Sequence, residues 1–226
     1  MTYKKDNKMF FDLGQITNMH QAQFYGGYVI PNKIQYDVAV DLGSNIGMFC
    51  LENHKKFADM FAIEANYFTF LSGLYNIQRH RIANVKCFNF AAAKNTGEIV
   101  KIYQNGQDSV GATTTPHMLQ VRSKDESTEP YHNVFSISLE GMFDFFGLNY
   151  VDYMKIDIEG AEYDFLLDKD LSRIASMGIE IHGNFGKEKK DQLKNHFDKY
   201  FEIYDVQYDD DAPGHSVITY VNKTMF

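Results

Sequence analysis

The chain has 226 residues, 44% of them hydrophobic, which is enough for one sizeable α/β domain with a buried core. Its 30 acidic and 22 basic residues give a formal net charge of −8. This charge disfavours binding to the phosphate backbone of a nucleic acid, so no nucleic-acid partner is expected. Cys50 and Cys87 lack a metal-ligand spacing and are interpreted as reduced core residues, and no apolar run is long enough for a signal peptide or a membrane span. We therefore expect a cytoplasmic protein that has no membrane partner.

Short apolar runs alternate with helical segments along the first half of the chain. Residues 1–35 are interpreted as an N-terminal capping segment, and residues 36–226 as the main domain. The alternation predicts parallel strands joined by crossover helices. The predicted elements are a strand at 36–42, a helix at 45–57, a strand at 60–64, a helix at 66–78 and a strand at 85–92.

The second half begins with a strand at 98–103 and then a polar segment, about 104–133, that is rich in Gly, Ser and Thr. Such a length without secondary structure is uncommon in a compact domain, so this segment is interpreted as an insertion or a lid. The two last strands have no helix between them and must pair antiparallel. The remaining predicted elements are strands at 134–139, 151–157, 176–182, 200–207 and 215–221 and helices at 140–146, 160–167 and 187–199.

The end of the first strand carries a candidate ligand-binding turn. In open α/β sheets, ligands bind at the carboxyl ends of the strands. Gly43 lets the backbone approach a ligand closely, Gly47 allows close packing of the helix, and Asp41 can accept hydrogen bonds from a ligand. Glu64 ends the next strand, where an acid can accept hydrogen bonds from both hydroxyls of a ribose, although a solvated acid at the end of a strand is an alternative reading. A nicotinamide dinucleotide is less favoured, because its fingerprint requires glycines where this chain has Asn45 and Met48.

Four stretches in order, VDLGSNIGMF, AIEAN, VKCFNFAAAKNTGE and VDYMKIDIEGAEYDFL, resemble the FkbM-type methyltransferases over about residues 36–182. The resemblance implies the class I methyltransferase fold, a Rossmann-like, doubly wound, mostly parallel seven-stranded sheet with one antiparallel strand near the C-terminus. It also implies S-adenosyl-L-methionine as the donor, and the O-methylation of a hydroxyl on a sugar, a glycan or a related metabolite. The donor-binding residues expected from the turn and from this match are Asp41, Gly43, Ser44, Asn45, Gly47, Glu64, Ala65, Asn66, Asn89, Phe90 and Ala91.

Methyl transfer to a hydroxyl requires positioning and a proton acceptor. Asp157 and Glu159 follow a buried strand whose end should lie beside the donor methyl, and His182 ends the next strand. These three residues are the catalytic candidates, and histidine is a natural base near neutral pH. The two acids can instead stabilise the start of the following helix, and His182 can be a structural residue. A divalent cation held by the same three residues is a less favoured alternative, because the sequence supplies no coordination geometry, so no metal site is assigned.

Two other functions stay open at this stage. One is a nicotinamide-dependent oxidoreductase, and the other is a protein that binds S-adenosylmethionine without catalysis. The carboxylates at positions 157 and 159 favour a catalyst. The expected partner is a small-molecule or glycan acceptor, and the sequence names neither the acceptor nor the oligomeric state.

Overall fold

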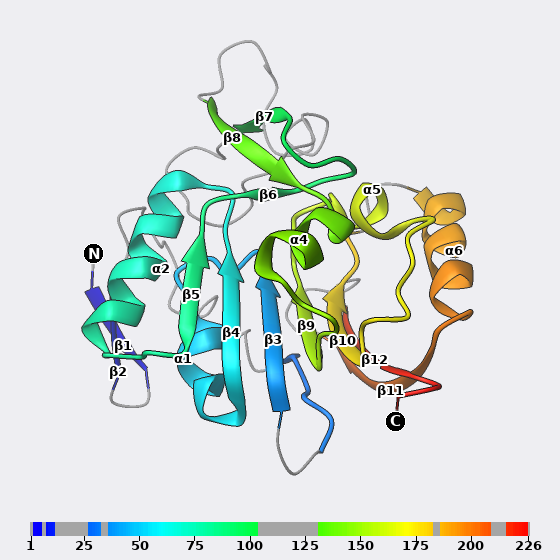
Figure 1. Cartoon of the computed structure of the whole chain (residues 1–226), viewed down its shortest axis with the longest axis horizontal. Helices are drawn as coiled ribbons and strands as arrows, with labels where there is room; N and C mark the ends of the chain where they lie inside the picture. The colour runs from blue at the N-terminus through cyan, green and yellow to red at the C-terminus, as the bar shows by residue number, and fades with distance from the viewer. Residues whose placement is uncertain are drawn as a thin grey trace.

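The computed structural model describes residues 2–5, 8–11, 27–32, 36–103, 131–182, 186–208 and 216–225. A seven-stranded sheet forms its centre, with the strand order β11-β12-β10-β9-β3-β4-β5 (Figure 1). All pairs from β10 to β5 are parallel, whereas β12 is antiparallel to both of its neighbours. The strands are β3 (Tyr36–Leu42), β4 (Phe57–Ile63), β5 (Val85–Phe88), β9 (Tyr153–Ile156), β10 (Ser176–Glu180), β11 (Phe201–Tyr208) and β12 (Ser216–Asn222). The expected class I methyltransferase topology is confirmed.

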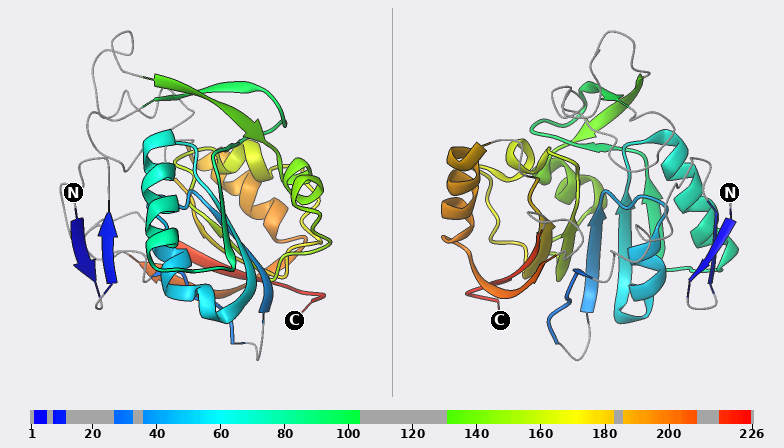
Figure 2. Two further views of the ribbon diagram at one scale, coloured as in Figure 1. Left: turned by 60° about the vertical axis from the view of Figure 1, so that its left-hand side comes forward. Right: turned by 180° about the vertical axis from the view of Figure 1, so that it is seen from behind.

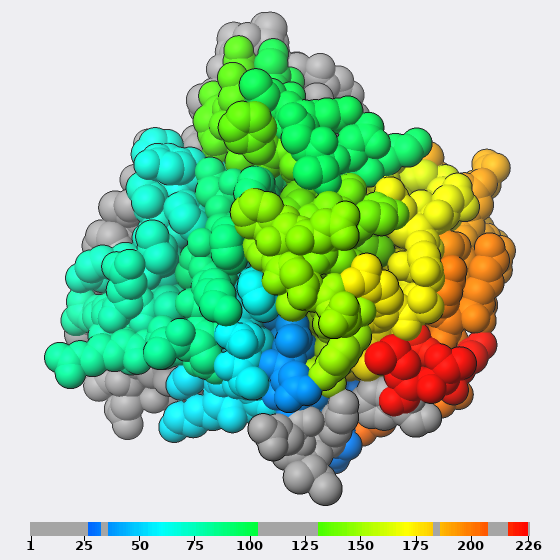
Figure 3. Space-filling model, viewed as in Figure 1, coloured from blue at the N-terminus to red at the C-terminus, as the bar shows by residue number. Residues whose placement is uncertain are grey.

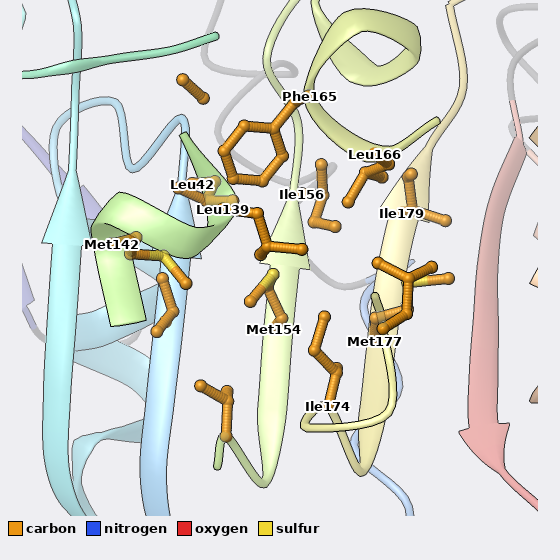
Figure 4. Close-up of a cluster of buried hydrophobic side chains, with 14 of the residues drawn as sticks. Leu42, Leu139, Met142, Met154, Ile156, Phe165, Leu166, Ile174, Met177 and Ile179 are labelled. Carbon is orange, nitrogen blue, oxygen red and sulfur yellow. The ribbon is translucent and has the colours of Figure 1, made fainter. Parts of the chain in front are cut away.

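Helices pack on both faces of this sheet, so the sheet is doubly wound. One buried cluster joins the sheet to three helices, namely α4 (Leu139–Phe146), α5 (Glu162–Leu166) and α6 (Gly186–Phe197). In this cluster Phe165 lies against the end of β9 (Figure 4). The cluster on the opposite face lies against α1 (Met48–Asn53) and part of α2 (Tyr67–Arg79), as Figure 2 shows from behind. This cluster also contains Tyr28.

A second, three-stranded sheet was not expected from the sequence. It has the order β6-β8-β7 and lies across the carboxyl ends of β3, β4 and β5 (Figure 1). Its strands are β6 (Ala91–Ala92), β7 (Ile99–Tyr103) and β8 (Tyr131–Ile137). The predicted strand 85–92 is therefore two strands in two different sheets. In the space-filling view, the segment from β8 through α4 covers the middle of the face seen in Figure 1 (Figure 3).

Several predicted bounds were wrong for local reasons. The helix predicted from residue 45 begins only at Met48, because Asn45 and Gly47 have left-handed φ values of 49° and 83°. It ends at Asn53, a 3-10 turn η2 (His54–Lys56) follows, and β4 starts three residues earlier than predicted. Residues 131–133 of the predicted insertion belong to β8. Residues 104–130, on which the lid interpretation rests, lie outside the described residues.

Little of the predicted capping segment is described. Residues 2–5 and 8–11 form the antiparallel hairpin of β1 (Thr2–Lys5) and β2 (Lys8–Phe11), which lies beside α2 (Figure 2). Tyr28 is buried and meets Phe49 edge to face. Cys50 and Cys87 are free. Among the helices that are described, none has both the length and the hydropathy that crossing a membrane requires.

Candidate active site

The turn after β3 is built against the end of β9. Gly43 has φ +73°, and a Cβ atom at this position would lie only 1.7 Å from the carbonyl oxygen of Asp157. The backbone amides of Gly43 and Ser44 both donate to the carbonyl oxygen of Ile63, so the turn is also tied to β4. Glycine is required here because any side chain would push the β3 and β9 ends apart. The turn thus brings the predicted donor-binding segment into contact with the predicted catalytic segment.

Gly47 is needed for its backbone conformation. It is the N-cap of α1 and has a left-handed φ of +83°, while a Cβ at this position would lie at an ordinary contact distance, 3.6 Å, from the Cα of Gly73 in α2. A Cβ at Gly73 would in turn lie 3.0 Å from the carbonyl oxygen of Asn45. Gly73 therefore lets α2 pack closely against the donor turn, whereas Gly47 supplies the left-handed backbone that starts α1.

Glu64 organises this turn through both of its carboxylate oxygens. Oε2 accepts a hydrogen bond from the backbone amide of Asn45 at 2.9 Å, and Oε1 accepts one from the amide of Asn66 at 2.8 Å. Burial raises the pKa of Glu64 to about 7, even though the two amide donors favour the ionised form. A carboxylate has about four acceptor positions, so two remain for further donors such as ribose hydroxyls.

One polar atom beside Glu64 lacks a partner within the described part of the chain. Asn45 Oδ1 is buried and has no hydrogen bond there. Buried side-chain acceptors in native proteins are nearly always satisfied, so an isolated one at a turn of this kind fits a ligand-binding position. Ser44, the preceding residue, is also buried.

The other residues expected at the donor site support the local backbone. Asn66 caps α2 by accepting from the amides of Phe68 and Thr69. The side-chain amide of Asn89 donates to the carbonyl oxygens of Glu64 and Ala65, at 2.8 and 2.9 Å. Two more have apolar surroundings. Phe90 is half-buried beside Phe88 and Phe145, and Ala91 is buried against Ile102 and Val134 with Ala65 at the edge.

Lys155 is a central residue of the site that the sequence analysis did not single out. It lies in β9, is fully buried, and its Nζ donates to the carbonyl oxygen of Gly43 at 2.6 Å. Nζ also lies 3.3 Å from Asp41 Oδ1 and 3.7 Å from Asp157 Oδ2. Burial alone would lower the pKa of Lys155, but the charges of Asp41 and Asp157 outweigh it and hold the pKa above its ordinary value. The ammonium group therefore ties the donor turn to the catalytic segment.

The three catalytic candidates lie together, as predicted. His182 Nε2 is 3.4 Å from Glu159 Oε2, and ligand atoms of Asp157, Glu180 and His182 all lie within 4.8 Å of one another. Glu162, at the start of α5, completes the group because its Oε1 is 2.9 Å from His182 Nδ1. Glu162 and Glu180 were not predicted from the sequence as members of this group. The signals were the KIDIEGAE stretch, which contains Glu162, and the position of Glu180 two residues before His182 in the predicted strand 176–182.

The electrostatics of this group change the expected role of His182. Burial by itself would lower the pKa of His182, but the hydrogen bond and charge of Glu162, with the charges of Glu159 and Asp157, raise the pKa to about 10. In the structure as it stands, the imidazole therefore holds a proton at neutral pH. The expectation of a base that titrates near neutrality does not fit these surroundings.

Comparison with known proteins points to one family. The model of the methyltransferase FkbM domain matches residues 41–208, from the donor turn through β11. Trm5b from Pyrococcus abyssi has a similar structure, with a TM-score of 0.55 and 11% identity over 97% of this chain, and the chain spans about 55% of that protein. A precorrin-6y C5,15-methyltransferase from Geobacter metallireducens is similar with a TM-score of 0.51 and 12% identity, over 94% of this chain and 93% of its own.

A third similar structure is TrmK from M. capricolum with S-adenosyl-homocysteine, which has a TM-score of 0.50 and 11% identity over 94% of this chain and 71% of its own. At such identities these structures establish the fold alone. No protein of curated function matches the chain in sequence.

Proposed function

The chain belongs to the FkbM family of class I S-adenosylmethionine-dependent methyltransferases, and on that premise we propose that it methylates a hydroxyl of a sugar, a glycan or a related metabolite. The observation that carries the proposal is the contact between Gly43 and Asp157. Gly43 belongs to the turn that would hold the donor, and Asp157 begins the group of carboxylates that would face the acceptor. Family membership also displaces the nicotinamide-dependent alternative.

The donor would lie over the carboxyl ends of β3 and β4. Each carboxylate oxygen of Glu64 already accepts one backbone amide, from Asn45 or Asn66. The remaining acceptor position on each oxygen would accept a hydrogen bond from one of the two ribose hydroxyls. Asn45 Oδ1 would accept from a polar hydrogen of the donor. Asp41 is fully buried beside Lys155, so we assign it to the support of the turn rather than to direct contact with the methionyl amine.

The reaction is an in-line displacement in which the acceptor oxygen attacks the methyl carbon and the carbon–sulfur bond breaks. The hydroxyl proton must leave as the new oxygen–carbon bond forms, and the sulfonium becomes a neutral thioether. The side chain of Asp157 is 19% exposed, and that of Glu159 is 20% exposed. Both carboxylates are therefore accessible enough to meet an acceptor yet held by buried neighbours, which suits a group that receives a proton.

The charge of the protein bears on the class of acceptor. A net charge of −8, with four carboxylates gathered around His182, repels a polyanion. A neutral polyhydroxylated acceptor meets no such repulsion, and its hydroxyls can donate to these carboxylates. This consideration separates the proposal from a nucleic-acid substrate such as tRNA.

The test has two stages. Calorimetry should first show binding of S-adenosylhomocysteine, and Glu64→Ala should weaken it roughly tenfold to a hundredfold, since a charge-assisted hydrogen bond contributes about 1.5–3 kcal/mol. Glu52→Ala, at an exposed position of α1, is the matched control.

The protein is then incubated with labelled donor and separate pools of soluble glycans, small metabolites and tRNA. We expect a product 14 mass units heavier (about one CH₂) in a glycan or metabolite pool. Label in tRNA alone would refute the proposed acceptor class, and donor binding without label in any pool would favour a non-catalytic binding protein.

A further inference from the structure

The titratable side chains at the ends of β9 and β10 are more numerous than the transfer of one proton requires. Asp157, Glu180 and His182 each offer one ligand atom, and these atoms lie within 4.8 Å of one another. Ligands on opposite sides of an octahedral divalent cation are about 4.2 Å apart, at about 2.1 Å from the ion. The three atoms would therefore need only a small inward shift to share one ion. Carboxylate oxygen and imidazole nitrogen are ligands that suit such cations.

The orientation of His182 is a second, independent observation. Its Nδ1 lies 2.9 Å from Oε1 of Glu162, which is fully buried, and its Nε2 faces Glu159 and Glu180 at 3.4 and 3.9 Å. Histidines that bind metals almost always donate their other ring N–H to a carboxylate or carbonyl, which fixes the tautomer and the ring plane. Glu162 Oε2 is itself buried and has no hydrogen bond to any described residue. Glu162 thus has the position of an outer partner that orients a metal ligand.

The charges of the side chains around His182 also favour a bound cation. Four carboxylates surround the imidazole of His182, namely those of Asp157, Glu159, Glu162 and Glu180. The ammonium group of Lys155 lies near two carboxylates, those of Asp157 and Asp41. Buried carboxylates in proteins are paired with a cation or coordinate a metal. The backbone also deviates here, since Glu159 has a left-handed φ of 51°, ahead of Gly160 at 99°. Strain of this kind at a residue other than glycine is concentrated at functional sites.

We propose that Asp157, Glu180 and His182 form a divalent-cation site that binds the acceptor oxygen next to the donor methyl group. The inference rests on the proposed methyl transfer and deepens it. A cation that coordinates the acceptor hydroxyl lowers its pKa and fixes its position, so the oxygen loses its proton more readily before attack. Coordination displaces the proton from His182 Nε2 and leaves Nδ1–H bonded to Glu162. Asp157 is then a ligand rather than a base, so Glu159, whose side chain is 20% exposed, receives the proton of the acceptor hydroxyl. Glu180 takes the place of Glu159 among the three cation ligands considered from the sequence.

The experiment measures metal binding without any acceptor. The full chain is treated with a chelator and dialysed, and free Mn²⁺ is followed by electron paramagnetic resonance during titration. We expect one saturable Mn²⁺ per chain that Mg²⁺ displaces in competition. Glu180→Gln and Asp157→Asn should each weaken Mn²⁺ binding at least tenfold, and Glu162→Gln should weaken it tenfold to a hundredfold through the orientation of His182. Glu202→Gln, at an exposed position of β11, should bind as the wild type does.

Binding of S-adenosylhomocysteine is measured on the same samples and should be retained by every variant. Retained binding of S-adenosylhomocysteine shows that the donor half of the site is folded. It also lets the cation site and the methyl transfer be tested separately. If S-adenosylhomocysteine binds but Mn²⁺ does not, the cation site is refuted and the proposed methyl transfer remains. Equal Mn²⁺ affinity in the wild type and in Glu180→Gln also overturns the assignment. If Mn²⁺ binds as expected while no pool is methylated, the cation site stands and its role toward an acceptor fails.

Discussion

Asp41 and Lys155 are register partners on the neighbouring parallel strands β3 and β9, and their fully buried charges lie 3.3 Å apart. Neither side chain has access to water, so each is the main counter-charge of the other. A buried ion pair adds little stability by itself, but the removal of one partner leaves an uncompensated charge. This pair therefore makes the donor turn and the catalytic segment one structural unit.

Lys155→Met removes the charge and shortens the unbranched side chain by one atom. Asp41 then remains buried without a cation, so the free energy of unfolding should fall by about 3–5 kcal/mol. Urea denaturation followed by circular dichroism measures this change. The matched control is Lys86→Met, which breaks the half-exposed pair between Lys86 and Asp59 and should cost no more than about 1 kcal/mol. Equal losses in the two variants would contradict the role given to Lys155.

Gly43→Ala tests the contact between β3 and β9. Its Cβ would collide with the Asp157 carbonyl oxygen, and its φ of +73° disfavours any other residue. Gly97 has a similar φ of +84° but open space around it, so Gly97→Ala isolates the conformational cost of about 1–2 kcal/mol. Gly43→Ala should be less stable by a further 1–3 kcal/mol, roughly, because backbone must move. Thermal denaturation compares the two, and a Gly43→Ala protein as stable as Gly97→Ala would refute the close approach.

The raised pKa of Glu64 predicts a pH dependence of donor binding. With a pKa of about 7, Glu64 changes from about one tenth ionised at pH 6 to about nine tenths at pH 8. The ionised form accepts stronger hydrogen bonds from ribose hydroxyls. The affinity for S-adenosylhomocysteine should therefore rise by up to about tenfold between these pH values. Calorimetry with Glu64→Gln should show a flat profile, and a wild-type profile that falls with pH would contradict the assignment.

The same shift affects the donor-free protein with the opposite sign. The pKa of Glu64 in the folded state lies above the ordinary value of 4.5, so burial favours the protonated form. Its contribution to the free energy of unfolding is fully present below pH 4.5 and is lost as the pH rises through about 7. Denaturation with and without S-adenosylhomocysteine should show this loss only in the donor-free wild type, and not in Glu64→Gln.

Asp157→Asn preserves the size of the side chain and removes its charge. Turnover should fall at least about a hundredfold, whether Asp157 receives the proton or holds a cation, since contributions of such groups run from about 10² to 10⁴. The affinity for S-adenosylhomocysteine should change little. The exposed Asp164→Asn on α5 is the control. A loss of donor affinity at unchanged turnover would make Asp157 a donor ligand, and a lower melting temperature with full activity would leave it a structural role only.

The fold could be predicted from short-range patterns because each strand and helix has its own periodicity and turn residues. The break between β5 and β6 could not, because it depends on Asn89, whose side chain bonds to carbonyl groups at the end of β4. Lys155 was overlooked for a similar reason. A lysine inside an apolar strand is buried only because Asp41 and Asp157 supply its counter-charges. No local sequence pattern predicts the contact between Lys155 and Asp41, which lie on different strands. The positions of Glu64 and Asp157, at the ends of strands, were open to prediction from topology.

The two amide hydrogen bonds to Glu64 have a consequence for the thermodynamics of donor capture. Because Asn45 and Asn66 already donate to this carboxylate, the turn after β3 and the start of α2 are ordered before any ligand arrives. Binding then has little backbone entropy left to lose. The heat-capacity change should match the apolar surface that the ligand itself covers, without the larger negative value that accompanies the folding of a loop upon its ligand. In this respect the donor turn acts as a rigid receptor.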